Sequence, residues 1–148
     1  AIITAGGGAS AIASLTAVPG CSNTLVDAVM PYSNTASEEL LDCRTDERVS
    51  AQVGSELAHH AYRKADRLVR LRHDEEALAG AKPIVVGLGC TAAVQTTGGG
   101  SGGYAAFVTC WHIGGTANFA LRLPKSHTRA QQECAIGALL IYALTRAD

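Results

Sequence analysis

The chain has 148 residues, of which 47% are hydrophobic and 17% charged, a composition that fits one folded domain and excludes a disordered chain. Its formal net charge of −1 argues against nucleic acid or an anionic membrane as a partner. The longest apolar runs, 84–88 and 138–144, are too short to span a bilayer, and the first residues carry no basic leader. We therefore expect a cytoplasmic protein.

Apolar periodicity and turn-forming residues predict strands that alternate with helices. In chain order we expect a strand ending near residue 4, a helix from 6–8 to about 17, a strand over 24–30, a helix from 33 or 34 to about 41, a helix over 51–72, a strand over 84–88, strands over 104–112 and 116–123, and a helix over about 128–145. This order favours a single α/β domain over residues 1–148, built as a three-layer α/β/α sandwich with a mixed, mostly buried sheet.

Glycine is abundant, with 16 residues, and it predicts close backbone approach in the packing. Gly137 lies inside the last predicted helix and indicates a tight contact between helices. The run 98–103 is a low-complexity loop, which is either a lid over a pocket or an idle connector.

The chain holds five cysteines, an odd number, and no C-x-x-C pair. This argues against a zinc ribbon or a redox dithiol, and we expect reduced, mostly buried thiols. His59 and His60 are adjacent, so a helix points them in different directions and they do not share an ion easily. We expect neither a metal nor a cofactor.

Three stretches together resemble the C-terminal domain of the CinA (competence/damage-inducible) family, which includes nicotinamide-mononucleotide deamidases. They are Val18-Pro19-Gly20 with Tyr32-Ser33-Asn34 at a fixed distance, Val49-Ser50 at the start of a long helix, and the segment 86–91 with the sequence VGLGCT. The resemblance covers nearly the whole chain. A helix that precedes the first strand in the family has no counterpart in this sequence.

The resemblance implies that two reactive groups of deamidases are missing here. Active relatives carry an E-S-C-T-G-G motif, and alignment from the V-P-G turn places Thr4 at the glutamate, Ala5 at the serine and Gly6 at the cysteine. The family lysine falls on Ser37. Because alanine cannot act as a nucleophile and serine cannot replace the cation, we expect altered or lost activity, and the catalytic residues stay unknown.

The remaining residues suggest binding. A glycine triplet at a helix start either seats a phosphate or only makes a tight turn, Arg129 either pairs with an anion or lies on the surface, and Cys90 is either a nucleophile or a buried structural thiol. The residues expected to contact a nucleotide or phosphate are Thr4, Gly6, Gly7, Gly8, Tyr32, Ser33, Asn34, Gly89, Cys90, Thr91 and Arg129.

Three functions stay open at this point. The first is a CinA-type amidohydrolase acting on a nicotinamide nucleotide. The second is a non-catalytic nucleotide- or phosphate-binding regulator that keeps the pocket without the reaction. The third is a structural partner in a homo-oligomer, suggested by apolar surface such as 138–144.

Overall fold

The computed structural model describes residues 1–42, 46–75, 83–99 and 102–147. Within these residues a mixed sheet of five strands has the order β2-β1-β3-β4-β5. The strands are β1 (Ile2–Ala5), β2 (Ala28–Val29), β3 (Val86–Ala93), β4 (Tyr104–His112) and β5 (Gly115–Leu123). β1 pairs in parallel with both β2 and β3, whereas β3, β4 and β5 are antiparallel. The sheet is therefore parallel at one side and a meander at the other.

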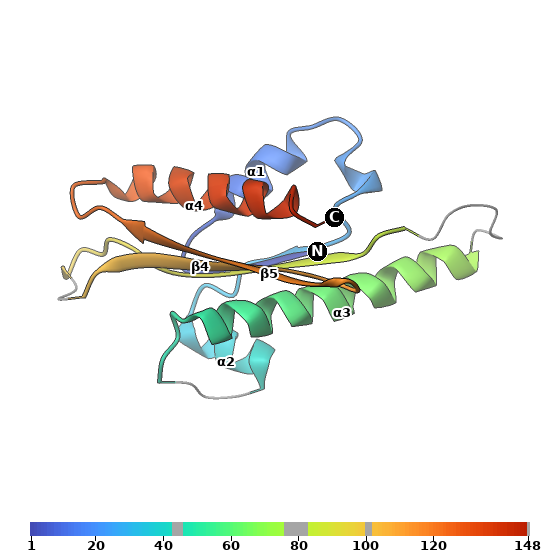
Figure 1. Ribbon diagram of the computed structural model, residues 1–148, viewed down its shortest axis with the longest axis horizontal. Helices are drawn as coiled ribbons and strands as arrows, with labels where there is room; N and C mark the ends of the chain where they lie inside the picture. The colour runs from blue at the N-terminus through green and yellow to red at the C-terminus, as the bar shows by residue number, and fades with distance from the viewer. Residues whose placement is uncertain (43–45, 76–82, 100–101, 148) are drawn as a thin grey trace.

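Helices cover both faces of the sheet (Figure 1). One face carries α1 (Ala9–Thr16) and α4 (Arg129–Leu144), and the other carries α2 (Asn34–Leu41) and α3 (Ala51–Glu75). The predicted three-layer α/β/α architecture is thus confirmed. Thr128 begins α4 with a capping box, in which its hydroxyl accepts from the amide of Gln131 and the Gln131 side chain accepts from the Thr128 amide. This cap satisfies two helix-end donors and defines where α4 starts.

The core has two parts, one on each face of the sheet. Alternation along β1 directs Ile2 toward α1 and α4, and Ile3 toward α3, as expected where successive side chains point to opposite faces. Leu88 and Cys90 join the α4 side, while Leu57 of α3 fills the other side. All five side chains are at most 3% exposed, so β1 and β3 form the centre of a buried sheet.

Glycines allow α3 to lie directly on β3. A Cβ atom at Gly87 would clash with the backbone of Ala58 and Tyr62, and one at Gly89 would clash with the backbone of Ala58 and Gly54. On the opposite face, a Cβ at Gly137 would clash with the Ser10 hydroxyl where α1 crosses α4. The predicted close approach of the backbone is therefore confirmed on both faces of the sheet.

The strand predicted over 24–30 is wrong in extent, because β2 comprises Ala28 and Val29. The preceding residues turn as a 3-10 helix, η1 (Cys21–Asn23), and the amides of Thr24 and Leu25 donate to the carbonyl of Cys21. These amides are therefore committed to a turn and are unavailable to a sheet ladder.

The strand predicted over 84–88 is also misplaced. Ile84 is 75% exposed and precedes β3, which instead continues to Ala93. Gly89, Cys90 and Thr91 lie beyond the predicted end of the strand, yet all three pair with β1 on one side and β4 on the other. Double pairing fixes this glycine-containing segment as a central strand.

The described cysteines are free thiols: Cys90 and Cys110 are buried, Cys21 is half-buried and Cys134 is exposed. Cys43 and part of the glycine loop, residues 100–101, lie outside the described residues. Throughout the described segments, no helix is both long enough and apolar enough to cross a bilayer.

Candidate functional site

A small pocket lies where the three parallel strands end. β1, β2 and β3 run in the same direction, so their carboxyl ends share one edge of the sheet. From β1 the chain turns to α1 on one face, and from β2 it turns to α2 on the other (Figure 1). A crevice forms where neighbouring connections leave on opposite faces, and ligands of open α/β sheets bind in such crevices.

This strand-end pocket has a volume of about 110 Å³. Its walls come from the turn after β1, the segment leading into α2, the approach to α3 and the end of β3. The lining residues are Ala5, Gly6, Pro31, Tyr32, Asn34, Ser37, Glu38, Leu41, Arg48, Val49, Val53, Leu57, Thr91 and Ala92. The lining combines buried aliphatic side chains such as Val53 and Leu57 with hydroxyl, amide and charged side chains, a combination typical of small-molecule sites.

Four of the predicted contact residues line this pocket: Gly6, Tyr32, Asn34 and Thr91. Ala5 and Ser37, the two positions at which the sequence lacks an expected reactive group, line it as well. The turn after β1 therefore adjoins a cavity, as the sequence argument requires, and a methyl group and a hydroxymethyl group face the same space.

The other predicted residues lie elsewhere. Ser33 is the N-cap of α2, because its hydroxyl accepts from the amide of Ala36. Thr4 and Cys90 face the α4 side of the sheet, and Gly89 faces α3. Arg129 donates through Nη2 to the carbonyl of Gly6 at 3.0 Å and so secures the turn after β1.

The serine and threonine hydroxyls that line the strand-end pocket are both engaged with backbone carbonyls. Ser37 Oγ donates to the carbonyl of Pro31 at 3.1 Å and lies 3.3 Å from that of Ser33. Thr91 Oγ1 donates to the carbonyl of Arg48 at 2.7 Å. A serine or threonine nucleophile needs a base that takes its proton. Since these bonds run to neutral carbonyls, neither hydroxyl is activated in this arrangement.

An ion pair lies at the pocket that the sequence argument did not identify. Arg48 Nη2 lies 2.8 Å from Glu38 Oε1, with the two side chains 40% and 26% exposed. No motif marked Arg48, which follows an acidic loop and precedes Val49-Ser50. Ser50, two residues after Arg48, was a signal from which the position of Arg48 could have been predicted. Its hydroxyl accepts from the amide of Val53 and caps α3, so Arg48 lies just before the start of this helix.

The glycine triplet is packed against β3 and α4, and its amides are partly occupied. The Glu133 carboxylate on α4 accepts from the amides of Gly8 and Ser10 at 2.9 and 3.0 Å. Thr4 Oγ1 donates to the carbonyl of Gly7. Gly8, with φ 101°, is the N-cap of α1. An external anion at this turn must therefore displace Glu133, which already supplies the negative charge that a helix N-terminus favours.

Cys90 has the properties of a structural thiol. It is completely buried, and burial raises the pKa of its thiol to about 12; the nearby Glu133 carboxylate adds to this increase, while a hydrogen bond with Thr4 opposes it. The thiolate is the reactive form of cysteine, and its concentration at neutral pH is negligible when the pKa lies this high.

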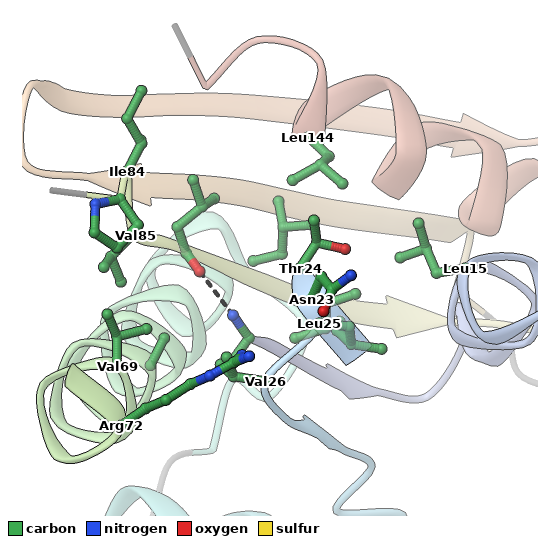
Figure 2. Close-up of a pocket in the computed structure, with 16 residues that line it drawn as sticks. Leu15, Asn23, Thr24, Leu25, Val26, Val69, Arg72, Ile84, Val85 and Leu144 are labelled. Atoms are coloured by element: carbon green, nitrogen blue, oxygen red, sulfur yellow. Dashed lines mark hydrogen bonds between the residues drawn. The ribbon is translucent and has the colours of Figure 1, made fainter. Parts of the chain in front are cut away.

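A second and larger cavity, about 640 Å³, lies at the opposite ends of the parallel strands. Figure 2 shows leucine and valine side chains from α1, the segment before β2, α3, β3 and α4 around this space. The dashed line in Figure 2 is the hydrogen bond from the Ala1 amino group to the Val86 carbonyl, 2.8 Å long. Apart from Arg72, Asn23 and Thr24, its lining is mostly apolar, and it contains none of the predicted contact residues.

His59 packs against Trp111, with ring centroids 4.6 Å apart. Among the described residues, no three histidine, cysteine, aspartate or glutamate side chains are grouped so that they could hold a metal ion. The described part of the site is therefore built from hydroxyl, amide, guanidinium and carboxylate groups.

Solved structures share this fold. The competence/damage inducible protein CihA from Agrobacterium tumefaciens aligns with a TM-score of 0.67 and 17% identity, covering 99% of this chain and 85% of that chain. A CinA superfamily protein from Escherichia coli gives 0.63 and 16%, covering 98% and 77%. A competence or damage-inducible protein from Enterobacter asburiae gives 0.60 and 16%, covering 99% and 87%.

No protein-family model and no curated protein matches the sequence. The structural likeness nevertheless extends over nearly the full chain. The chain has the fold of the CinA superfamily structures, and the resemblance predicted from the sequence is confirmed at the level of the fold. Because fold does not fix activity, the function depends on the residues that line the pocket.

Proposed function

We propose that this protein binds a nicotinamide nucleotide, or a closely related phosphate-bearing small molecule, in the strand-end pocket without hydrolysing its amide. The observation that carries the proposal is the position of Ala5 and Ser37, which line the same pocket. The resemblance to deamidases assigns a nucleophilic serine to one position and a lysine to the other. A pocket that is present but lacks both reactive groups is suited to binding a ligand without hydrolysing it.

The neighbouring groups support this reading, because none of them replaces the missing chemistry. Ser37 and Thr91 donate to backbone carbonyls. The Cys90 thiol lies on the other face of the sheet, and burial raises its pKa to about 12. Amide hydrolysis through a covalent intermediate requires an activated nucleophile within reach of the carbonyl carbon. The described residues of this pocket offer none.

The size of the pocket restricts how a nucleotide is held. Pockets that enclose whole drug-sized ligands measure about 300–1,000 Å³, whereas this one measures about 110 Å³. One group of the ligand therefore enters, and the rest lies across the mouth. Tyr32, 70% exposed, offers a ring for stacking there, and the exposed Asn34 offers an amide.

The test is to incubate the protein with nicotinamide mononucleotide and to measure heat of binding and ammonia release on the same preparation. We expect saturable binding with a stoichiometry of about one per chain and no ammonia above the buffer rate. Turnover that follows protein concentration would revive an amidohydrolase. If the preparation shows neither binding nor turnover, the nucleotide is ruled out as a ligand and the structural-partner hypothesis remains.

A further inference from the structure

The strand-end pocket has a single ion pair among the described residues that line it, Arg48 with Glu38. We propose that Arg48 is the residue that binds the anionic group of the ligand, and that Glu38 is a built-in competitor that holds the guanidinium while the pocket is empty. This inference rests on the proposed function, because it names the group of the ligand that the pocket recognises.

The backbone of Arg48 is tied to β3 beside the pocket by a hydrogen bond. Its carbonyl accepts the Thr91 hydroxyl at 2.7 Å, from a β3 residue that is 2% exposed. Two residues later Ser50 caps α3. A guanidinium on an anchored backbone is pre-positioned, and pre-positioning lowers the entropy that is lost when a ligand is bound.

The side chain has donors to offer a ligand. The Arg48 guanidinium meets Glu38 through Nη2, and a guanidinium has five N–H donors arranged in a planar fork. Arginine binds phosphate through two parallel hydrogen bonds more readily than through one. A phosphate monoester with three terminal oxygens can therefore share the guanidinium with Glu38 or displace it.

The chemistry of the pocket also favours an anion over a neutral group at this wall. The Arg48 side chain is 40% exposed, so a charged group reaches it without being buried against aliphatic side chains such as Val53 and Leu57. The ligand class that fits is a small molecule with one phosphate or carboxylate group.

Three ligands separate the possible contributions: nicotinamide mononucleotide, nicotinamide riboside, which lacks the phosphate, and inorganic phosphate. Each is titrated calorimetrically into the wild-type protein and into Arg48→Met, which keeps the aliphatic stem and removes the charge. We expect Arg48→Met to weaken the mononucleotide roughly tenfold to a hundredfold, the range for a lost charge-assisted hydrogen bond. We expect riboside affinity to change by less than about twofold, because the riboside has no anionic group for the guanidinium to bind.

Glu38→Gln is expected to raise affinity where Arg48→Met lowers it, and this difference separates an effect on binding from an effect of misfolding. It keeps the shape of the side chain and removes the competing charge, so phosphate and mononucleotide affinity should rise about twofold to tenfold. A folding defect does not increase affinity. The matched controls are Arg70→Met and Asp66→Asn, which dismantle an exposed ion pair of the same 2.8 Å length on α3 and should leave all three affinities unchanged.

The outcomes separate this inference from the proposed function. The role of Arg48 is overturned if Arg48→Met and the wild-type protein bind the mononucleotide equally well. It is also overturned if the variant loses the same affinity for the mononucleotide and the riboside. In both cases the proposed function still stands. Hydrolysis of the mononucleotide with a KM that rises in Arg48→Met overturns the proposed function and supports Arg48. Failure of the wild-type protein to bind either phosphate compound overturns both.

Discussion

The Glu133 carboxylate on α4 accepts a 2.9 Å hydrogen bond from the backbone amide of Gly8, 125 residues earlier in the chain. The same oxygen accepts from Ser10 at 3.0 Å, and the Ser10 hydroxyl donates to the Glu133 carbonyl at 2.9 Å. α4 thus caps α1, and it does so at the turn where the sequence argument placed a phosphate.

Glu133→Ala should therefore destabilise the protein. It leaves two half-buried amides at the start of α1 without their acceptor and removes a negative charge from the positive end of the helix dipole. We expect a loss of about 1–2 kcal/mol in the free energy of unfolding, measured by urea denaturation. Glu39→Ala, at an exposed position of α2, is the control. Equal stability of the two variants would show that the cap contributes nothing.

The same variant tests whether the glycine turn is an anion seat. With Glu133 removed, the amides of Gly8 and Ser10 are free to bind phosphate. Inorganic phosphate should then raise the melting temperature of Glu133→Ala more than that of the wild-type protein, with chloride at equal ionic strength as reference. An equal rise in both proteins would argue that phosphate acts elsewhere.

Gly89→Ala should damage the fold severely. The added methyl would meet the backbone of α3 at Ala58 and Gly54, and neither a helix backbone nor a central strand yields easily. We expect a loss of roughly 2–4 kcal/mol by urea denaturation. At Gly102 a Cβ would have no neighbour within 4 Å, so Gly102→Ala should change stability by less than about 0.5 kcal/mol. Similar values for the two would refute the close approach of α3 and β3.

The Cys90 thiol predicts a loss of stability in alkali. Burial raises its pKa from 9.0 to about 12, so the unfolded chain releases this proton first. The contribution of the thiol is fully present below pH 9 and declines as the pH rises toward 12, by on the order of 1–2 kcal/mol at pH 10.5. Urea denaturation at pH 8 and pH 10.5 measures it.

Cys90→Ala should reduce this alkaline decline, and Cys134→Ala, at an exposed thiol, should retain it. Iodoacetamide at pH 8 should label Cys134 in the folded protein and leave Cys90 unmodified until denaturant is added. Rapid native labelling of Cys90 would contradict the buried, protonated thiol.

Restoring both missing groups should introduce chemistry into the pocket. Ala5→Ser together with Ser37→Lys places a hydroxyl and an amine on walls of the same pocket, where the amine can accept the hydroxyl proton. We expect ammonia release from nicotinamide mononucleotide on the order of tenfold to a hundredfold above either single variant. Identical rates in the double variant, both single variants and buffer would argue against this pocket as the place where the amide lies.

The sequence predicted those parts of the fold that depend on local signals. The amphipathic pattern over 51–72 reappears in α3, and the helices predicted to begin near Ser33 and Thr128 begin there as α2 and α4. It failed at β3, which was predicted over 84–88 and instead runs from Val86 to Ala93. The role of Gly87 and Gly89 becomes visible only once α3 is in place, because the absence of their side chains allows the α3 backbone to lie against β3.

The site was predicted in part for the same reason. The position of Ala5 next to a pocket was implied by the family resemblance, through the alignment from the V-P-G turn. The ion pair of Arg48 with Glu38, and the bond from Gly8 to Glu133, join residues from different elements. No periodicity or spacing in the chain encodes such a pairing, because it depends on how the layers are stacked.

The central claim is that the strand-end pocket binds the nucleotide and leaves its amide intact. One experiment tests both halves: nitrogen-15-labelled protein is titrated with nicotinamide mononucleotide while proton spectra follow the nucleotide in the same tube. The account predicts amide shifts that cluster at Ala5, Gly6, Asn34 and Thr91, with unchanged nicotinamide signals over a day. Accumulation of the deamidated nucleotide, or shifts that cluster instead around Leu25 and Val69 in the larger cavity, would contradict it.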